Sequence, residues 1–229
     1  MIVAVDPIRV VIVMLLTMMA TAPVYAQQPL LHHLEVSLGG GVFGAGSLGS
    51  IDANLRANSA TPQPYRVFST SSRLGAAPLL ETRLAFTLTR RLSLEGRFGY
   101  SRPDVRTSVS GDVESAPAVT IIERIDQFAI DGGIKVRIDE WRLTGFTPFV
   151  TAGAGYLRQL HAGQALVEQG HNYFVGGGVT RPLVTRNRHM VKTIALRGDG
   201  RLDLLVGGIG PRDRPRPHGS FSAAIVIGF

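Results

Sequence analysis

The sequence predicts an all-β fold: an eight-stranded antiparallel up-and-down transmembrane β-barrel, preceded by a cleavable signal peptide. Three observations predict it: eight segments of alternating apolar and polar residues, connections that are alternately long and short, and an aromatic last residue, Phe229. Strict alternation is the period of a strand whose two faces meet different surroundings. The composition agrees, because a chain with 45% hydrophobic residues is not a disordered one.

Residues 1–26 have the organisation of a secretory signal peptide. An apolar run over residues 10–20 is followed by a short stretch of small residues that ends at Ala26, as signal peptidase requires. We therefore expect cleavage between Ala26 and Gln27, which leaves residues 27–229 as one barrel domain. A membrane-spanning helix is the alternative, but the run is shorter than the roughly 20 residues that a bilayer needs.

The alternation divides the mature chain into eight expected strands. They cover residues 34–42, 80–88, 92–100, 127–138, 146–156, 173–184, 193–202 and 221–229. In the second strand, Leu80 and Leu84 alternate with Glu81 and Arg83. The sixth has the weakest pattern, and we expect Pro182 to end it, because proline cannot donate to a ladder of strand hydrogen bonds. Several strands reach about ten residues, the length that crosses a bilayer at a tilt of about 45°.

The connections between these segments alternate in length. Long connections follow the first, third, fifth and seventh segments, and short turns follow the others. This rhythm is typical of an outer-membrane barrel with long loops outside and short turns in the periplasm. The first long connection contains a Ser/Thr/Asn/Pro-rich stretch, Asn58–Ser72, which we expect to be a mobile loop rather than a strand.

One face of the expected strands mixes small residues with charges of both signs. A barrel of eight strands is narrow, so side chains must fill its interior. Charges placed there must pair, because an unpaired buried charge is costly. We expect a structural plug, with an ion path as the alternative. The predicted lumenal charge network consists of Glu35, Glu81, Arg83, Glu95, Arg97, Asp131, Lys135, Arg137, Arg197, Asp199 and Arg201.

The last strand carries a pattern of its own. Phe221, Ile225, Ile227 and Phe229 lie on one face, and the terminal carboxylate directly follows an aromatic residue. This pattern resembles the C-terminal insertion signal of bacterial outer-membrane proteins. The resemblance implies that the outer-membrane assembly machinery recognises the strand.

The mature chain also resembles the small barrels typified by the transmembrane domain of outer-membrane protein A. Pro148–Tyr156 is similar to the glycine-rich fifth strand of such barrels, and Arg197–Arg201 is similar to their lumen-facing charges. The resemblance implies a location in the cell outer membrane. The net charge of +7 makes the anionic phosphates of membrane lipid and lipopolysaccharide the expected partners there.

The last long connection is a candidate phosphate-binding loop. Arg212, Arg214 and Arg216 stand among prolines beside the expected membrane surface, and the chain carries a net charge of +7. Arginine forks bind phosphate oxygens bidentately, so these residues would suit lipopolysaccharide; a merely solvated loop is the alternative. Nucleic acid is a poor partner, because no stacking aromatic residues accompany the arginines.

Catalytic and metal chemistry have little support in the sequence. His161, His171, Asp203, Ser220 and Ser222 fall near one rim of the expected barrel, but no motif joins them. The chain has no cysteine. We expect no cofactor and no enzyme, but an integral outer-membrane protein with an envelope-structural or surface-interaction role through its loops. The alternatives are a narrow channel or conduit for small hydrophobic molecules, and a lipid-modifying enzyme.

Overall fold

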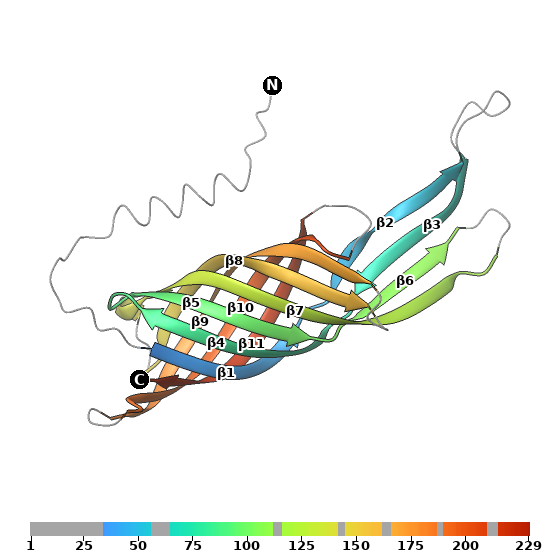
Figure 1. Ribbon diagram of the computed structural model, residues 1–229. Coiled ribbons are helices and arrows are strands. Elements are labelled where there is room, and N and C mark those ends of the chain that lie inside the picture. The colour runs from blue at the N-terminus through green and yellow to red at the C-terminus, as the bar shows by residue number, and fades with distance from the viewer. Residues whose placement is uncertain are drawn as a thin grey trace, which may run out of the picture. The chain divides into compact units, whose positions relative to one another are not determined.

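Eleven strands and one helical turn make up the described part of this computed structural model (Figure 1). The described residues are 34–55, 65–111, 116–141, 145–161, 166–186, 190–209 and 215–229. The expected signal peptide and its cleavage site at Ala26 and Gln27 lie outside them. No helix among the described residues is long and apolar enough to cross a membrane.

The elements follow one another along the chain with few interruptions. They are β1 (Leu34–Phe43), β2 (Gly46–Leu55), β3 (Tyr65–Leu74), β4 (Ala77–Thr87), β5 (Leu92–Ser101), β6 (Asp104–Ser110), β7 (Val119–Arg137), the helical turn η1 (Asp139–Trp141), β8 (Thr147–His161), β9 (Val167–Thr185), β10 (Thr193–Gly207) and β11 (Arg216–Gly228).

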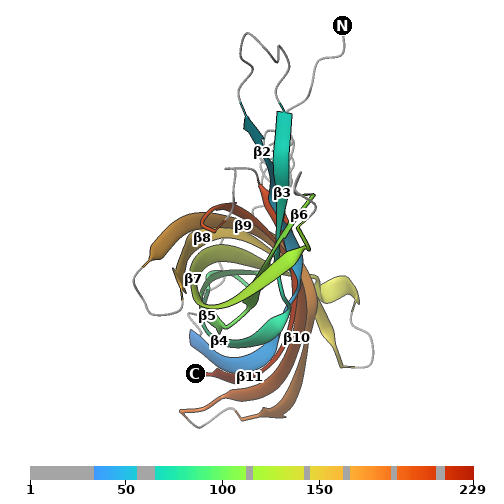
Figure 2. The same cartoon turned by 90° about the vertical axis from the view of Figure 1, so that its right-hand side faces the viewer.

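Eight of the strands close into a ring of antiparallel pairs (Figure 2). Their order is β7-β5-β4-β1-β11-β10-β9-β8, and β8 pairs back with β7. The first and last strands are neighbours, with Val36 opposite Ile227. Closure pairs the backbone groups of every ring strand on both sides and leaves no edge, as a bilayer requires. The predicted eight-stranded antiparallel barrel is confirmed.

The exterior of the ring is apolar, and its interior is polar. Leu38, Leu80 and Ile130 point outward, and each exposes about 60% of its surface. In the same strands, Glu81 and Arg83 point inward and are 2% exposed. A soluble barrel would bury the first set and expose the second. The reversed pattern therefore identifies lipid as the surrounding medium of the ring.

A second sheet continues beyond one end of the ring and is called the outer sheet (Figure 1). It consists of β2, β3, β6 and the segment Val119–Arg124 of β7, in that order. The expectation of a mobile loop over Asn58–Ser72 is wrong for residues 65–72, because they belong to β3; residues 56–64 lie outside the described part. Serine and threonine are compatible with a strand once neighbours pair on both sides, as β2 and β6 do here.

Pro182 does not end its strand as expected. β9 continues to Thr185, and its register against β10 shifts between Ile194 and Ala195, leaving Leu183 without an opposite residue. A bulge absorbs the hydrogen bond that proline cannot make. Strand β9 therefore passes the proline instead of stopping at it.

Candidate functional site

A network of buried ion pairs fills the middle of the barrel lumen. Arg83 donates two parallel hydrogen bonds to Asp199, at 2.7 and 2.9 Å, and a third to Glu81 Oε1 at 2.7 Å. Glu95 accepts hydrogen bonds from Arg83 at 3.3 Å and from Arg197 at 3.1 Å. All five side chains are buried. Charge-assisted, bidentate pairs of this kind are the strongest hydrogen bonds available to side chains.

A second part of the network centres on Asp131 of β7. Both Arg97 and Arg201 pair with its Oδ2 atom, Arg201 at 3.2 Å. The guanidinium carbon of Arg201 also lies 3.6 Å from the centroid of the Phe174 ring. A cation over an aromatic face gains about 2 kcal/mol or more where water is excluded. Lumenal aromatic rings therefore stabilise charge as well as fill space.

The structure brings most of the predicted network together. Nine of its eleven residues are buried inside the ring, and Glu35 pairs with the buried Lys135 at 2.7 Å. Arg137 lies apart: its side chain is 37% exposed and pairs with Asp139 at 3.0 Å, beside the turn that follows β7. Arg137 thus belongs to the rim rather than to the lumenal charge network.

Several inward polar residues were not in the predicted network. Gln159 donates to Gln127 Oε1 at 2.7 Å, and Asp203 accepts hydrogen bonds from Ser220 at 3.1 Å and Asn172 at 3.4 Å. The alternation of side chains along a strand could have identified Asp203. This residue continues the inward-facing series of Arg197, Asp199 and Arg201 beyond the expected end of the strand. The strands extend further than the apolar alternation indicates, so Gln159, Asn172, Asp203 and Ser220 lay outside the expected segments, whereas Gln127 lies inside one but is uncharged.

The charges that line the lumen balance. With Asp203 and Arg216 added to the ten predicted members, the lumen holds six acidic and six basic side chains in the described part of the chain. They are Glu35, Glu81, Glu95, Asp131, Asp199 and Asp203 against Arg83, Arg97, Lys135, Arg197, Arg201 and Arg216. A neutral interior lets a narrow barrel hold many charges without a net field.

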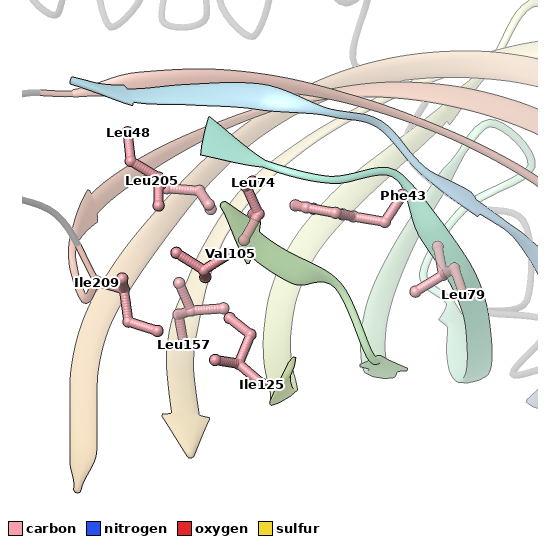
Figure 3. Close-up of a cluster of buried hydrophobic side chains, with 9 residues drawn as sticks. All are labelled: Phe43, Leu48, Leu74, Leu79, Val105, Ile125, Leu157, Leu205 and Ile209. Atoms are coloured by element: carbon pink, nitrogen blue, oxygen red, sulfur yellow. The ribbon is translucent and has the colours of Figure 1, made fainter. Parts of the chain in front are cut away.

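An apolar cluster, here called the cap, closes the lumen at the end that carries the outer sheet (Figure 3). Side chains from the base of the outer sheet meet side chains from the ring strands in it. Leu74 and Ile125 are 1% and 0% exposed. The members are Phe43, Leu48, Leu74, Leu79, Val105, Ile125, Leu157, Leu205 and Ile209. The outer sheet is therefore anchored to the ring by packing as well as by continuous strands.

The structure places Arg216 differently from the predicted phosphate-binding loop. Arg216 begins β11, its side chain is 6% exposed, and its guanidinium donates to the carbonyl oxygens of Gly207 and Ile209. The prediction that Arg216 contacts lipopolysaccharide is wrong, because its position in β11 directs its side chain into the barrel, where it is buried. Arg212 and Arg214 lie outside the described residues.

The polar groups near this end form no Ser–His contact among the described residues. The hydroxyl of Ser220 donates to Asp203, while the buried ring of His218 stacks on Phe43 with centroids 5.3 Å apart. His171 lies on the outward face, edge-on to Tyr156. No cluster of possible metal ligands occurs in the described ranges.

The outer sheet has two unlike faces. The face that continues the inward side of the ring leads upward from the cap and exposes apolar side chains, among them Ile51, Phe68, Val119 and Ile121. The opposite face continues the lipid-facing side of the ring and carries Arg73, Arg106, several hydroxyl residues and the exposed Ile122, which lies directly opposite Arg106. Strand β2 forms one edge, and no described strand pairs with its outer side.

The C-terminal strand completes the ring. Phe221 and Ile225 point outward and are 73% and 53% exposed. The backbone N–H of Phe229 donates to the carbonyl oxygen of Leu34 at 2.9 Å. The apolar face predicted for the insertion signal is therefore the lipid-facing side of the strand that joins the two ends of the barrel. Its recognition by the assembly machinery stays a prediction.

Solved structures resemble this architecture. Neisserial surface protein A (NspA) superposes with a TM-score of 0.51 at 11% identity, over 86% of this chain and 97% of that one. The fold is that of a small bacterial outer-membrane β-barrel. Outer membrane protein AlkL gives a TM-score of 0.42 at 15% identity, over 91% of this chain and 95% of AlkL. Ail of Yersinia pestis gives 0.37 at 13%, over 85% and 98%.

No protein-family model matches the sequence, and no curated protein matches it. The outer-membrane barrel fold nevertheless indicates which end of the barrel faces the periplasm and which faces outward. Short turns of such barrels lie in the periplasm and long connections lie outside the cell. The cap and the outer sheet are therefore at the extracellular end, and the strands lie in the outer membrane.

Proposed function

We propose that this outer-membrane barrel is a non-enzymatic surface-interaction protein, with a closed barrel as its anchor and the outer sheet as its binding part. The observation that carries the proposal is that the first two extracellular connections continue as a four-stranded sheet. This sheet presents an unpaired edge and an exposed apolar face. Both are features by which proteins recognise partners.

The edge strand β2 favours an extended polypeptide as the partner. It runs for ten residues, from Gly46 to Leu55, and carries one charged residue, Asp52, and no proline. Edge strands that avoid pairing usually carry charges, prolines or covering elements. Apart from Asp52 and two register shifts against β3, at Ser47/Gly49 and Ala53/Asn54, β2 has no such protection among the described residues. Between these shifts it presents backbone donors and acceptors to a peptide that adds to the sheet.

The filled lumen favours an anchor over a conduit. The lumenal charge network occupies the middle of the barrel, and the cap closes its extracellular end. The cavity between them measures about 20 Å³ and is lined by Arg97, Gln127, Asn172 and Asp203, among others. A cavity of this size has room for about one water molecule. Passage of an ion or a small hydrophobic molecule would require the network and the cap to separate.

The test removes the outer part of the first hairpin and leaves its base in place. Gly49 and Ser72 face each other across β2 and β3, so a two-residue Asn-Gly turn can replace residues 50–71. This variant keeps Leu48 and Leu74 in the cap. We expect heat-modifiable gel migration like that of the intact protein, which reports a folded barrel.

Binding is measured with the mature protein in lipid nanodiscs, against arrays of immobilised polypeptides and polysaccharides. We expect polypeptide binding by the intact protein and its loss in the shortened variant. A matched control replaces residues 162–165, between β8 and β9, with the same turn and should retain binding. Binding unchanged by loss of the hairpin, no binding by the intact protein, or steady conductance in planar bilayers would each contradict the proposal.

A further inference from the structure

Two arginines face each other across strands of the outer sheet. Arg73 of β3 is directly opposite Arg106 of β6. Both are exposed and lie on the outward face, which continues the lipid-facing side of the ring. Side chains directly opposite one another have Cβ atoms about 5 Å apart, and like charges placed so are destabilising. Neither guanidinium has an ion pair or a side-chain hydrogen bond within the described ranges.

The barrel contains a second pair of the same kind, and it is neutralised. Arg83 of β4 is directly opposite Arg97 of β5 in the lumen. Carboxylates of Glu81, Asp199 and Asp131 pair with these two side chains. Where the protein itself holds two arginines side by side and dry, it supplies the anions. At Arg73 and Arg106, no carboxylate within the described ranges forms such a pair.

The nearest outward carboxylate is already engaged. Asp104, two residues before Arg106 in β6, forms an ion pair with its opposite residue Arg124 at 3.4 Å. Lower on the same face, Asp126 pairs with Arg102 at 2.9 Å and accepts a hydrogen bond from Tyr100 at 2.7 Å. The two acidic groups below the arginine pair, Asp104 and Asp126, thus already have partners of their own.

Hydroxyl groups lie directly above the arginine pair. One row further from the membrane, Ser50, Ser71, Ser108 and Thr120 line up across the four strands. Serine and threonine hydroxyls both donate and accept hydrogen bonds, as sugar hydroxyls do. A pair of anion-binding forks below a row of hydroxyls suits a charged saccharide better than a bare inorganic ion.

The height of the pair on the barrel identifies the source of such a saccharide. Phe98, Tyr100 and Phe128 form a group of aromatic rings on the lipid-facing side; the ring centroids of Phe98 and Tyr100 lie 6.3 and 5.1 Å from that of Phe128. Aromatic belts mark the membrane interface. Ile122, in the same row as Arg106, is six residues from Phe128 along β7. This separation is about 20 Å along the strand, or about 14 Å along the membrane normal for a strand tilted by about 45°. The pair therefore faces the sugar layer above the outer leaflet.

We propose that Arg73 and Arg106 form a binding site for the phosphate or carboxylate groups of the core saccharide of lipopolysaccharide in the surrounding leaflet. The two guanidinium forks bind the anionic oxygens bidentately, and the hydroxyl row binds the sugar. This site is on the face opposite the apolar one and does not depend on the polypeptide partner proposed above.

The test measures binding of fluorescent rough-type lipopolysaccharide to the mature protein in phosphatidylcholine bicelles. The variant is Arg73→Gln with Arg106→Gln, and its folding is checked by heat-modifiable migration. The control is Arg90→Gln with Arg91→Gln, which makes the same charge change in the periplasmic turn. We expect at least a fivefold loss of affinity in the outer-sheet variant and an unchanged affinity in the control.

Competition separates the possible sources of the anion. Core oligosaccharide freed of lipid should displace the labelled lipopolysaccharide, while inorganic phosphate at the same concentration should not. Equal competition by inorganic phosphate would overturn the assignment to a saccharide. Equal affinity of the outer-sheet variant and the intact protein would overturn the site itself.

Discussion

The lumen and the outer sheet treat the same residue in opposite ways. Each contains two arginines that face each other across neighbouring strands: Arg83 and Arg97 in the lumen, Arg73 and Arg106 outside. In the lumen every such guanidinium has a carboxylate partner, and in the outer sheet neither has one among the described residues. The difference follows from water. Desolvation makes an unpaired charge intolerable inside, whereas solvent or a bound anion can satisfy it outside.

The comparison also separates what holds the molecule together from what is available for binding. Charges inside the ring are buried and paired with one another, so removal of one partner should destabilise the barrel. On the outer sheet, Arg73 and Arg106 have no ion pair among the described residues and the apolar side chains are exposed, so we expect them to contribute little to stability. We expect mutations in matched positions of the two regions to differ accordingly.

The largest expected difference is between Arg83→Gln and Arg73→Gln. Removing Arg83 leaves Asp199 and Glu81 buried with less compensation, which should lower the free energy of unfolding by about 3–5 kcal/mol. Removing Arg73, which is exposed, should change it by no more than about 0.5 kcal/mol. The measurement is urea unfolding in phospholipid vesicles, read by gel migration. Similar losses in the two variants would contradict the distinction between the regions.

The next effect tests how firmly the cap joins the two regions. Leu74→Ala should cost about 2–4 kcal/mol, because it leaves a cavity between the outer sheet and the ring. Ile51→Ala, on the exposed part of the same sheet, should cost about 0.5 kcal/mol or less. A double-mutant cycle between Leu74 and Leu157 should show coupling. Strict additivity of those two changes would mean that the cap does not pack as a unit.

A smaller effect distinguishes the packed inside of the ring from its open outside. A Cβ atom on Gly153 would lie 2.7 Å from Cζ of Phe174 and would also meet the carbonyl oxygen of Gly132. Gly132 itself has nothing within 4 Å of a new Cβ. We expect Gly153→Ala to cost about 1–3 kcal/mol by overpacking and Gly132→Ala to cost nearly nothing. Equal stability of the two variants would show that the backbone of β7 opposite Gly153, as well as Phe174, can shift enough to admit a methyl group.

The two regions also differ in how well the sequence predicts them. The ring strands can be recognised in the sequence because lipid outside and charge inside impose a strict alternation of apolar and polar residues. Ten of the eleven predicted charges meet in the lumen. In β3, the run from Ser69 to Ser72 is polar on both faces and resembles a loop. Pairing with β2 and β6 makes it a strand, and the order of residues along one segment does not encode that pairing.

The same limit explains the candidate site. Arg216 stands among prolines and reads as a loop residue, yet the register of β11 against β10 places it opposite Leu205 and turns its side chain inward. Arg73 and Arg106 are 33 positions apart in the chain. They become neighbours, and so a candidate site, only when β3 and β6 pair. Inter-strand register, rather than local composition, decides which charges can meet a ligand.

The smallest expected effect lies where the two regions join. His161 Nδ1 of β8 is 2.8 Å from Glu123 Oε1, at the base of the outer sheet, and both side chains are partly exposed. Such a pair contributes about 1 kcal/mol or less, so Glu123→Gln should barely change global unfolding. Local opening should respond more, since β7 leaves the ring at this point. We expect faster amide hydrogen exchange over residues 119–124 in the variant, with unchanged exchange in β10. Equal exchange over residues 119–124 in the two proteins would mean that the cap alone, and not this pair, fixes the outer sheet to the ring.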